Sequence, residues 1–538
     1  MNKISKNLIL SIFPILFIFL ALNYKASIGE YYLGSYYDPS YSYLINSLNL
    51  SQFQGYGVGH FDHPGTPVQS IGAIVINIFH SLQHSNADKI NDILDNTEYY
   101  LQKIFLTILF LNAFALFILG YVANKKIGNI KTALFLQLTP FYSSTIYYSI
   151  TNVSPEPLLL FSTFILIAIT ISFLNNNNKN LNNNIYYVIV FGIICGFGLA
   201  TKLTFFPLLI IPLLLIPNFR YKLLLLLFIA ISFFIFILPA FSDTNAVKYS
   251  LWVKNLVTHS GKYGGGSEDF VDSSKYFSNI LTIFSKEWFF SSTYILLTIT
   301  LLLSFLTKFK VQIRSNKYYK LLVGIFIAMS VQVLIVSKHF EMHYLIPAFL
   351  LCALGVYTVY SIFNSQISQI THRKKEFLVY FTIILMSYFQ LRTMIKENRY
   401  FSSRRDESHK IITTLKNNYR ENLIVSTYGA SNVEFSTYYG AFWGGTQKSN
   451  YVLLLEKKYP NCIYYDRWRK DFYYFSSQDN LVSKLLKNDK LILQTDSEEV
   501  LNSFLIKLKE LTNKQNITYK NILSNFRGET IYEIYLNP

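Results

Sequence analysis

The sequence predicts a polytopic α-helical membrane protein that carries a small extracytoplasmic α/β domain at its C-terminal end. Hydrophobic residues make up 51% of the 538 residues and charged residues only 15%, whereas about a quarter of a soluble domain is charged. Apolar runs of bilayer length recur up to residue 394. Shorter, strand-like runs follow them.

The apolar runs are interpreted as membrane-spanning helices, because a helix satisfies its own backbone hydrogen bonds in lipid. A hydrocarbon core of about 30 Å needs about twenty apolar helical residues. About eleven such runs can be placed, with ragged ends, at residues 8–22, 104–122, 132–150, 158–174, 185–200, 205–216, 223–241, 289–306, 321–336, 344–363 and 377–394.

Lys and Arg residues indicate the orientation of these spans. They are concentrated in alternate connections, around residues 125–131, 179, 220–222, 308–320 and 373–375. By the positive-inside rule these connections are cytoplasmic. The N-terminus is then cytoplasmic, as an uncleaved signal-anchor, in the inner or plasma membrane, and an odd number of spans places the C-terminal domain outside.

The chain is predicted to divide into a transmembrane domain, residues 1–396, and an extracytoplasmic domain, residues 397–538. Two outer loops of the first domain are long, at residues 23–103 and 242–288. A short apolar stretch within the first loop, residues 68–82, predicts a helix lying at the membrane interface.

The C-terminal domain has the pattern of alternating strands and helices. Strands are expected at residues 423–427, 451–455, 491–494 and 531–535. An amphipathic helix is expected at residues 500–511, with Asp496 and Glu499 placed as a capping box.

The net charge of +17 does not indicate nucleic-acid binding, because the basic residues lie between apolar runs and form no stripe. Cys195, Cys352 and Cys462 have no metal-ligand spacing and indicate neither a zinc site nor a disulfide framework.

Ionisable residues beside the outer ends of the spans are the candidates for chemistry, because charge at membrane level is costly to keep. In the predicted topology four such clusters converge on one membrane face. Their candidate residues are Asp38, Asp62, Glu156 and Lys202, together with Lys338, His339 and His343.

The order of these clusters resembles that in the GT-C superfamily of glycosyltransferases, particularly its protein O-mannosyltransferase and aminoarabinose transferase branch. That family has an acid early in a long first outer loop and an acidic-x-Pro segment before a juxtamembrane helix. An acid then enters the fourth span, and a Thr-Lys pair lies between the fifth and sixth. The matching positions, within residues 8–394, are Asp38, Asp62 with Pro64, Glu156, and Thr201 with Lys202.

The resemblance implies roles for these residues. Asp38 would be the base that removes the proton of an acceptor hydroxyl, with Asp62 and Glu156 as further catalytic acids. Lys202 would neutralise the donor phosphate, and the candidates to assist it are Lys338, His339 and His343. Attack opposite the leaving group implies inversion. Many family members have two adjacent acids where this chain has Asp38 followed by proline, and Asp62 is the candidate substitute.

Each candidate acid also has a purely structural interpretation. Asp38 fits an N-cap with Pro39 at the first helical position. Asp62 and His63 fit a hydrogen-bonded turn, and Glu156, between two prolines, fits a cap of the fourth span.

The candidate cations and the glycine-rich loop have structural alternatives as well. Lys202 and Lys338 fit side chains that snorkel to the interface. The loop that holds His259, Lys262 and Tyr263 fits either a mobile substrate loop over the donor head group or a plain flexible connector.

The favoured function is therefore a lipid-linked-sugar glycosyltransferase with a polyprenyl-phosphate sugar as donor and a glycan, lipid or protein as acceptor. Membrane lipids are the expected surroundings, and nucleic acid is not an expected partner. No cofactor or metal ligand set is indicated, and a divalent metal is left open. The alternatives are a polysaccharide polymerase or ligase, and a transporter or flippase for lipid-linked substrates. A transporter would favour inverted repeats and mid-membrane charges, whereas the ionisable residues here gather at one edge.

Overall fold

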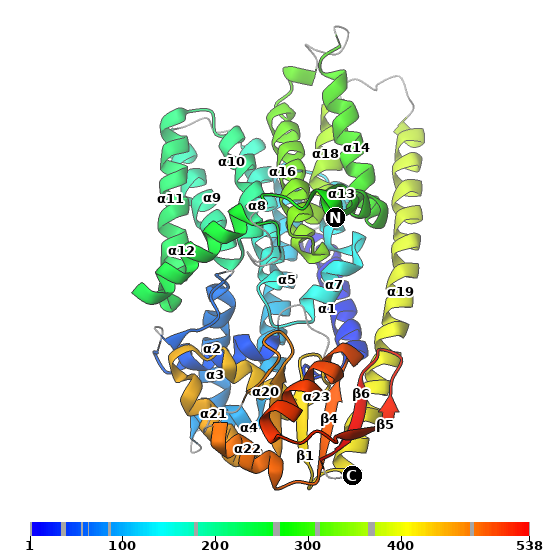
Figure 1. Cartoon of the computed structure of the whole chain (residues 1–538). Helices are drawn as coiled ribbons and strands as arrows, with labels where there is room; N and C mark the ends of the chain where they lie inside the picture. Colours follow the sequence, from blue (N-terminus) through cyan, green and yellow to red (C-terminus); the bar gives the residue numbers. More distant parts are fainter. Residues whose placement is uncertain are drawn as a thin grey trace.

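The computed structural model describes residues 3–33, 39–54, 57–62, 64–83, 88–176, 181–261, 269–306, 313–363, 372–473 and 478–536. A bundle of apolar helices occupies most of the chain, and a mixed sheet flanked by helices follows at the C-terminal end (Figure 1). The predicted fold class, an α-helical membrane protein with a C-terminal α/β domain, is confirmed by this arrangement.

Within the described residues, the bundle is built from nine long or apolar helices. They are α1 (Lys3–Ile28), α5 (Thr97–Ile127), α8 (Glu156–Leu174), α9 (Leu181–Thr201), α11 (Phe219–Ile237), α14 (Trp288–Leu303), α16 (Tyr319–Lys338), α18 (Cys352–Phe363) and α19 (His372–Asn418). Six segments of the described chain are long and apolar enough to cross a bilayer, namely Ile4–Ile28, Thr97–Ile127, Glu156–Leu174, Phe219–Ala240, Tyr319–Lys338 and Met342–Phe363. The total of about eleven spans stays a prediction.

Three predicted spans are interrupted helices. Residues 132–150 form α6 (Ile130–Gln137), a 3₁₀ turn (Thr139–Tyr142) and α7 (Ser144–Ile150). Pro140 is the second residue of the 3₁₀ turn, and Ser143 is extended, with φ −144° and ψ 129°. Because proline lacks the N–H that an α-helix needs, one straight helix cannot pass this point. Residues 205–216 are likewise split, into η3 (Leu203–Leu209) and α10 (Ile210–Leu215). Residues 344–363 are split into the end of η6 (Met342–Leu345), α17 (Ile346–Leu350) and α18.

The two long loops contribute helices of their own. The first holds α2 (Ser40–Ser51), α3 (Thr66–Gln83) and α4 (Lys89–Asp95), and the second holds α12 (Asp243–Thr258) and α13 (Ser273–Lys286). One face of α3 is buried, while Ile74, Ile78 and Leu82 are exposed one turn apart. The helix predicted at residues 68–82 is therefore present, with an outward apolar stripe that suits a lipid surface.

The C-terminal unit is a six-stranded sheet in the order β3-β2-β1-β4-β6-β5. Its strands are β1 (Leu423–Thr427), β2 (Cys462–Asp466), β3 (Asp471–Tyr473), β4 (Lys490–Thr495), β5 (Thr518–Ser524) and β6 (Thr530–Tyr535). β1 pairs in parallel with β2 and β4, and the other pairs are antiparallel. The flanking helices are α20 (Val433–Phe442), α21 (Lys448–Lys458), α22 (Gln478–Leu486) and α23 (Glu498–Thr512).

Three of the four predicted strands are confirmed as β1, β4 and β6, and the fourth is wrong. Residues 451–455 lie in α21, where Tyr451, Val452 and Leu455 are buried and Leu453 is 48% exposed. This spacing of one turn is helical, and a short apolar run cannot distinguish the two structures.

The predicted capping box of α23 is also wrong. Ser497 occupies the N-cap position, and its side chain makes no capping hydrogen bond. The Asp496 carboxylate instead accepts hydrogen bonds of 2.8 and 3.0 Å from Nη1 of Arg467. A charged donor outcompetes a backbone N–H for this carboxylate.

The C-terminal unit is packed tightly onto the first outer loop, and α2, α3, α20 and α21 lie together between bundle and sheet (Figure 1). Asn46 Nδ2 donates to the carbonyl oxygen of Trp443 at 3.0 Å, and Asn49 Nδ2 donates to that of Gly444 at 3.0 Å. A Cβ atom on Gly440 would lie 2.7 Å from the carbonyl oxygen of Tyr41, so only glycine allows this approach. The predicted boundary between residues 396 and 397 stays a prediction, and α19 continues unbroken across it.

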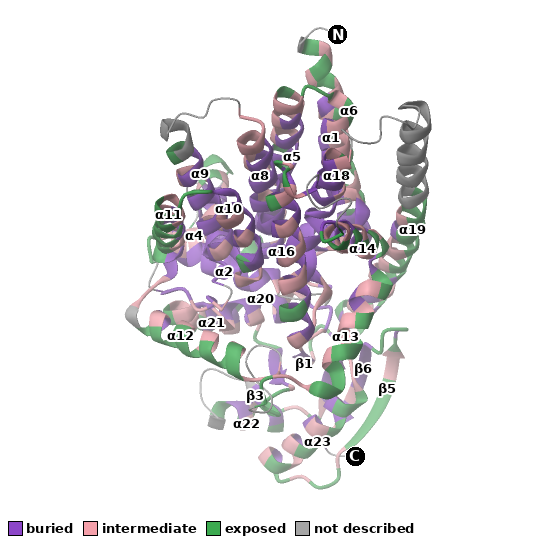
Figure 2. Cartoon of the chain, turned by 90° about the horizontal axis from the view of Figure 1, so that it is seen from above, coloured by how far each residue is buried: buried purple, intermediate pink, exposed green. Residues whose placement is uncertain are grey.

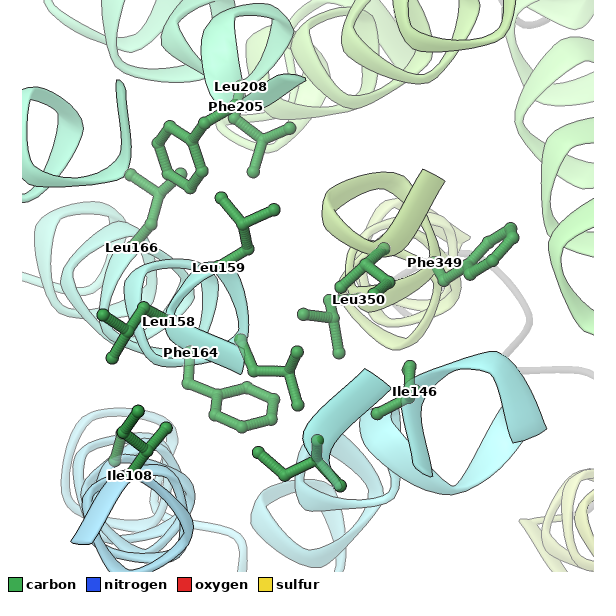
Figure 3. Packing of buried hydrophobic residues seen from close by; sticks show 14 of the residues in the cluster. Ile108, Ile146, Leu158, Leu159, Phe164, Leu166, Phe205, Leu208, Phe349 and Leu350 are labelled. Atoms are coloured by element: carbon green, nitrogen blue, oxygen red, sulfur yellow. The ribbon is translucent and has the colours of Figure 1, made fainter. Parts of the chain in front are cut away.

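The core of the bundle is one continuous cluster of buried hydrophobic residues. Buried residues concentrate at its centre (Figure 2), and Leu158, Leu159 and Phe164 of α8 pack towards Ile108 and Leu350 (Figure 3). This packing fixes the ends of α8, on which one of the candidate acids lies.

The loops segregate to two ends of the bundle. Lys317 Nζ donates to Asn175 Oδ1 at 2.9 Å, which joins two of the loops predicted to be cytoplasmic. Asn245 Nδ2 donates to the carbonyl oxygen of Val58 at 2.9 Å, which joins the two long loops predicted to be outside. The structure thus agrees with the grouping of these loops, while the side of the membrane stays a prediction.

Impermeant thiol labelling of intact cells tests that side. Lys520→Cys, in exposed β5, is expected to be labelled, and Ser315→Cys, an exposed position in residues 308–320, only after permeabilisation. Native Cys462 is a poor reporter because it is buried in β2. Labelling of Ser315→Cys in intact cells would reverse the topology and remove the proposed outer site.

Candidate active site

Glu156 and Lys202 form a buried ion pair at one end of the bundle. Glu156 is the first residue of α8, and Lys202 follows α9 with an extended backbone, φ −161° and ψ 137°. The Lys202 ammonium donates to Oε1 of Glu156, and each residue is only 3% exposed. The Lys202 ammonium is therefore turned into the protein and not out towards the interface, and Glu156 lies one residue after the N-cap position of α8, which Pro155 occupies.

The turn η6 brings the side chains of His343 and Tyr344 to the pair. Nε2 of His343 lies 3.7 Å from Oε1 of Glu156, and His343 is buried. The Lys202 ammonium lies 4.6 Å from the centre of the Tyr344 ring, within the range of a cation–π interaction. One carboxylate thus lies among a lysine, a histidine and an aromatic face.

The segment that holds Asp62 reaches the Glu156–Lys202 pair through its backbone. Pro64 forms an isolated antiparallel bridge with Lys202, and Asp62 lies two residues before Pro64, partly exposed. Gln69 Nε2 donates to the carbonyl oxygen of His60 at 2.5 Å and holds the start of this segment to α3. The structure therefore places the Asp62 segment beside the Glu156–Lys202 pair.

The segment that follows Asp38 is joined to the turn before Glu156. The backbone N–H of Val153 donates to Oγ of Ser40 at 3.1 Å, three residues before Glu156. Asp38 itself lies outside the described residues. Helix α2 begins at Ser40 with Pro39 at its N-cap position, one residue later than the capping interpretation of Asp38 requires.

The residues before Asp38 contact two charged side chains, Arg404 and Glu98, that the sequence did not predict as part of the site. Nη2 of Arg404 donates to the carbonyl oxygen of Leu33 at 3.0 Å. The Glu98 carboxylate accepts from the backbone N–H of Tyr31, at 3.1 and 3.0 Å, and from the Tyr41 hydroxyl at 2.6 Å. The described residues before and after Asp38 are thus held by α19, α5 and the turn before α8.

A sequence signal for this group exists but is weak. Lys25 lies 3.2 Å above the Tyr31 ring, and Glu98 lies in the first turn of α5. Both are charged residues next to apolar runs, the same signal that identified Glu156 and Lys202. Neither lies at the end of a predicted span, because the first predicted span ends at residue 22 and the second begins at residue 104.

Lys338 and His339 lie in a different setting, at the C-terminal end of α12. The Lys338 ammonium donates to the carbonyl oxygens of Leu256, at 3.2 Å, and Val257, at 2.5 Å. The His339 ring nitrogens lie 2.9 Å and 2.8 Å from the carbonyl oxygens of Leu256 and Gly261. Burial lowers the pKa of His339, although these carbonyls favour its charged form. The Lys338 cation is favourable at these helix C-terminal carbonyls, and the His339 ring contacts the same end of α12.

The predicted substrate loop is only partly described. His259 forms the C-cap of α12, and its Nδ1 lies 3.2 Å from the carbonyl oxygen of Asn255. Lys262 and Tyr263 lie outside the described residues. No group of three or more His, Cys, Asp or Glu side chains in the described part of the chain is placed to hold a metal ion.

Two carboxylates, those of Glu287 and Glu397, lie around the start of α7. Glu287 Oε1 accepts from the Ser143 hydroxyl at 3.1 Å and the Thr145 hydroxyl at 3.2 Å, and Glu397 Oε1 accepts from the Ser144 hydroxyl at 2.9 Å. Burial raises the pKa of Glu287 to about 7, and the charge of Glu397 adds to this rise.

This shift predicts a pH-dependent stability. The folded protein keeps a proton on Glu287 that the unfolded chain releases near its usual pKa of 4.5, so stability falls as pH rises from about 4.5 to about 7 and then levels off. Glu287 lowers the free energy of unfolding by an amount on the order of 3 kcal/mol over this pH range, and we expect Glu287→Gln to abolish that decrease. Thermal unfolding at about pH 5 and about pH 8 checks this. Glu499→Gln, at an exposed position, is the control, and equal pH slopes in wild type and Glu287→Gln would contradict the prediction.

Comparisons with known proteins give one structural match. No protein-family model and no curated protein sequence matches the chain. The structure is similar to the crystal structure of ArnT from Cupriavidus metallidurans bound to undecaprenyl phosphate, with a TM-score of 0.45, 10% sequence identity and 97% of each chain covered.

Proposed function

We propose that this protein is a membrane glycosyltransferase that transfers a sugar from a polyprenyl-phosphate donor to an acceptor hydroxyl on the extracytoplasmic face, with inversion. The observation that supports it is the buried contact between Glu156 and Lys202, with His343 3.7 Å from the same carboxylate. A buried charge persists only where it is paired, and such sites are commonly functional.

The proposed chemistry follows from the charges. Lys202, with His343 when protonated, neutralises the phosphate that leaves as the anomeric carbon is attacked. Glu156 holds this cation in place before the donor arrives. Asp38 accepts the proton of the acceptor hydroxyl, and Asp62 is the candidate for a second acid. Lys338 and His339 act indirectly, by holding the end of α12 and Gly261.

The alternative functions place different demands on the site. A transporter or flippase would line a continuous path with its polar residues, whereas Lys202 and His343 both meet the same Glu156 carboxylate at one end of the bundle. A polymerase or ligase would more often place its chemistry in a large loop late in the chain. The early segments around Ser40 and Pro64, which reach the Glu156–Lys202 pair, favour the glycosyltransferase.

The test is transfer of a labelled sugar. Membranes that contain the protein are incubated with labelled polyprenyl-phosphate sugars, and label is followed into lipid, glycan and protein fractions. Membranes that lack the protein serve as the blank. Transfer above the blank is expected for at least one donor, and equal label with and without the protein for every donor would refute the proposed function.

A further inference from the structure

A cavity of about 580 Å³ lies between the first outer loop and the C-terminal unit. Tyr32 of the first loop, Lys416 of α19, Glu434 of α20 and Tyr459 after α21 form its walls. Tyr32 comes from the first loop, and the other lining residues come from the end of α19 and from the C-terminal unit. Its volume falls within the range of about 300–1,000 Å³ that is usual for small-molecule sites.

The lining offers hydrogen-bond donors, acceptors and aromatic surface together. Lys416, Arg420 and Glu421 are exposed around it, and Glu434 is half-buried. None of these four side chains makes a hydrogen bond or ion pair with another residue in the described part of the chain. A pocket that keeps its charged groups unpaired has them available for a ligand.

The balance of charge indicates the class of ligand. Lys416 and Arg420 are offset by Glu421 and Glu434, and the remaining cation, Lys458, donates to Asp95 outside the cavity. A strongly anionic ligand would meet carboxylates as often as cations. A neutral, hydroxyl-rich ligand can donate to the carboxylates and accept from the cations, while tyrosine rings contact its C–H faces.

The cavity adjoins the segment that carries the proposed base. Tyr32 precedes Leu33, whose carbonyl is held by Arg404, and Asp38 follows five residues later. Burial, with the charges of Glu30, Glu98 and Glu434, raises the pKa of Tyr32 to about 12, so this hydroxyl stays a hydrogen-bond donor at neutral pH. The first loop therefore contributes a hydrogen-bond donor to the wall of the cavity.

We propose that this cavity binds the acceptor, and that the acceptor is an uncharged glycan segment. The role of the ligand as acceptor rests on the proposed function, whereas the binding of a glycan rests on the lining of the cavity itself. The C-terminal domain then selects the acceptor, and the membrane domain holds the donor.

Binding to the full-length protein in lipid nanodiscs tests this directly. The probes are fluorescently labelled uncharged oligosaccharides of a few hexose or N-acetylhexosamine units, with inorganic phosphate as competitor. We expect at least one oligosaccharide to bind, and Arg420→Ala and Glu434→Gln each to weaken it by about tenfold or more. The matched controls Arg527→Ala and Glu499→Gln, at exposed positions away from the cavity, should bind as wild type does.

The outcomes separate this proposal from the proposed function. No oligosaccharide binding, equal binding by all variants, or displacement by phosphate would overturn the glycan site even if sugar transfer occurs. Binding that depends on Arg420 and Glu434 without any transfer from polyprenyl-phosphate donors would keep the site and overturn the glycosyltransferase. Thermal unfolding midpoints of the variants exclude misfolding as the cause.

Discussion

Replacing Asp38 with asparagine is expected to lower sugar transfer by about a hundred-fold or more, because general-base catalysis contributes about that much. Asparagine keeps the shape of the side chain and cannot take the acceptor proton. Because α2 has its N-cap at Pro39, Asp38→Ala should give as much folded protein as Asp38→Asn. Initial rates of transfer, normalised to folded protein, measure the effect.

Asp62→Asn is the informative comparison for Asp38. Asp62 lies two residues from the Pro64–Lys202 bridge, so a supporting acid there should give a smaller loss than the base itself. Transfer by Asp38→Asn at the parental rate would remove Asp38 from the mechanism. A larger loss in Asp62→Asn than in Asp38→Asn would move the base to Asp62.

Replacing Lys202 with methionine is expected to destabilise the protein by about 3–5 kcal/mol, because it leaves the buried Glu156 carboxylate without its cation. Adding Glu156→Gln should recover most of this stability, since a neutral amide needs no counter-charge. Unfolding midpoints of wild type, Lys202→Met and the double variant measure both effects. Lys317→Met, which changes an exposed lysine at the opposite end of the bundle, is the matched control.

Activity of the double variant separates structure from catalysis. If Lys202 binds the donor phosphate, the double variant folds but uses the donor poorly, with the loss mainly in donor dependence. Parental donor kinetics in the double variant would show that the ion pair only stabilises the fold.

The sequence by itself determined the long apolar helices and the strands β1, β4 and β6. A helix in lipid must be long, apolar and self-satisfied in its hydrogen bonds, and these demands leave a signal that survives without any tertiary contact. The same reasoning failed at residues 132–150, where one proline and an extended serine divide an apolar run that composition alone cannot divide.

Glu156, Lys202 and His343 were each recognisable as costly charges beside a span, but their meeting was not. Glu156 and Lys202 are 46 residues apart, and Ser40 and Val153 are 113 apart. Only the packing of α8 against α9 and η6 decided which carboxylate faces which cation, and the same packing assigned Lys338 and His339 to the end of α12 instead. The tertiary structure also decided the docking of α20 on α2, and it placed Tyr32 in the wall of a cavity formed by α19 and the C-terminal unit. Short polar contacts between distant segments depend on backbones approaching to within a few ångströms, and no local pattern of residues encodes that distance.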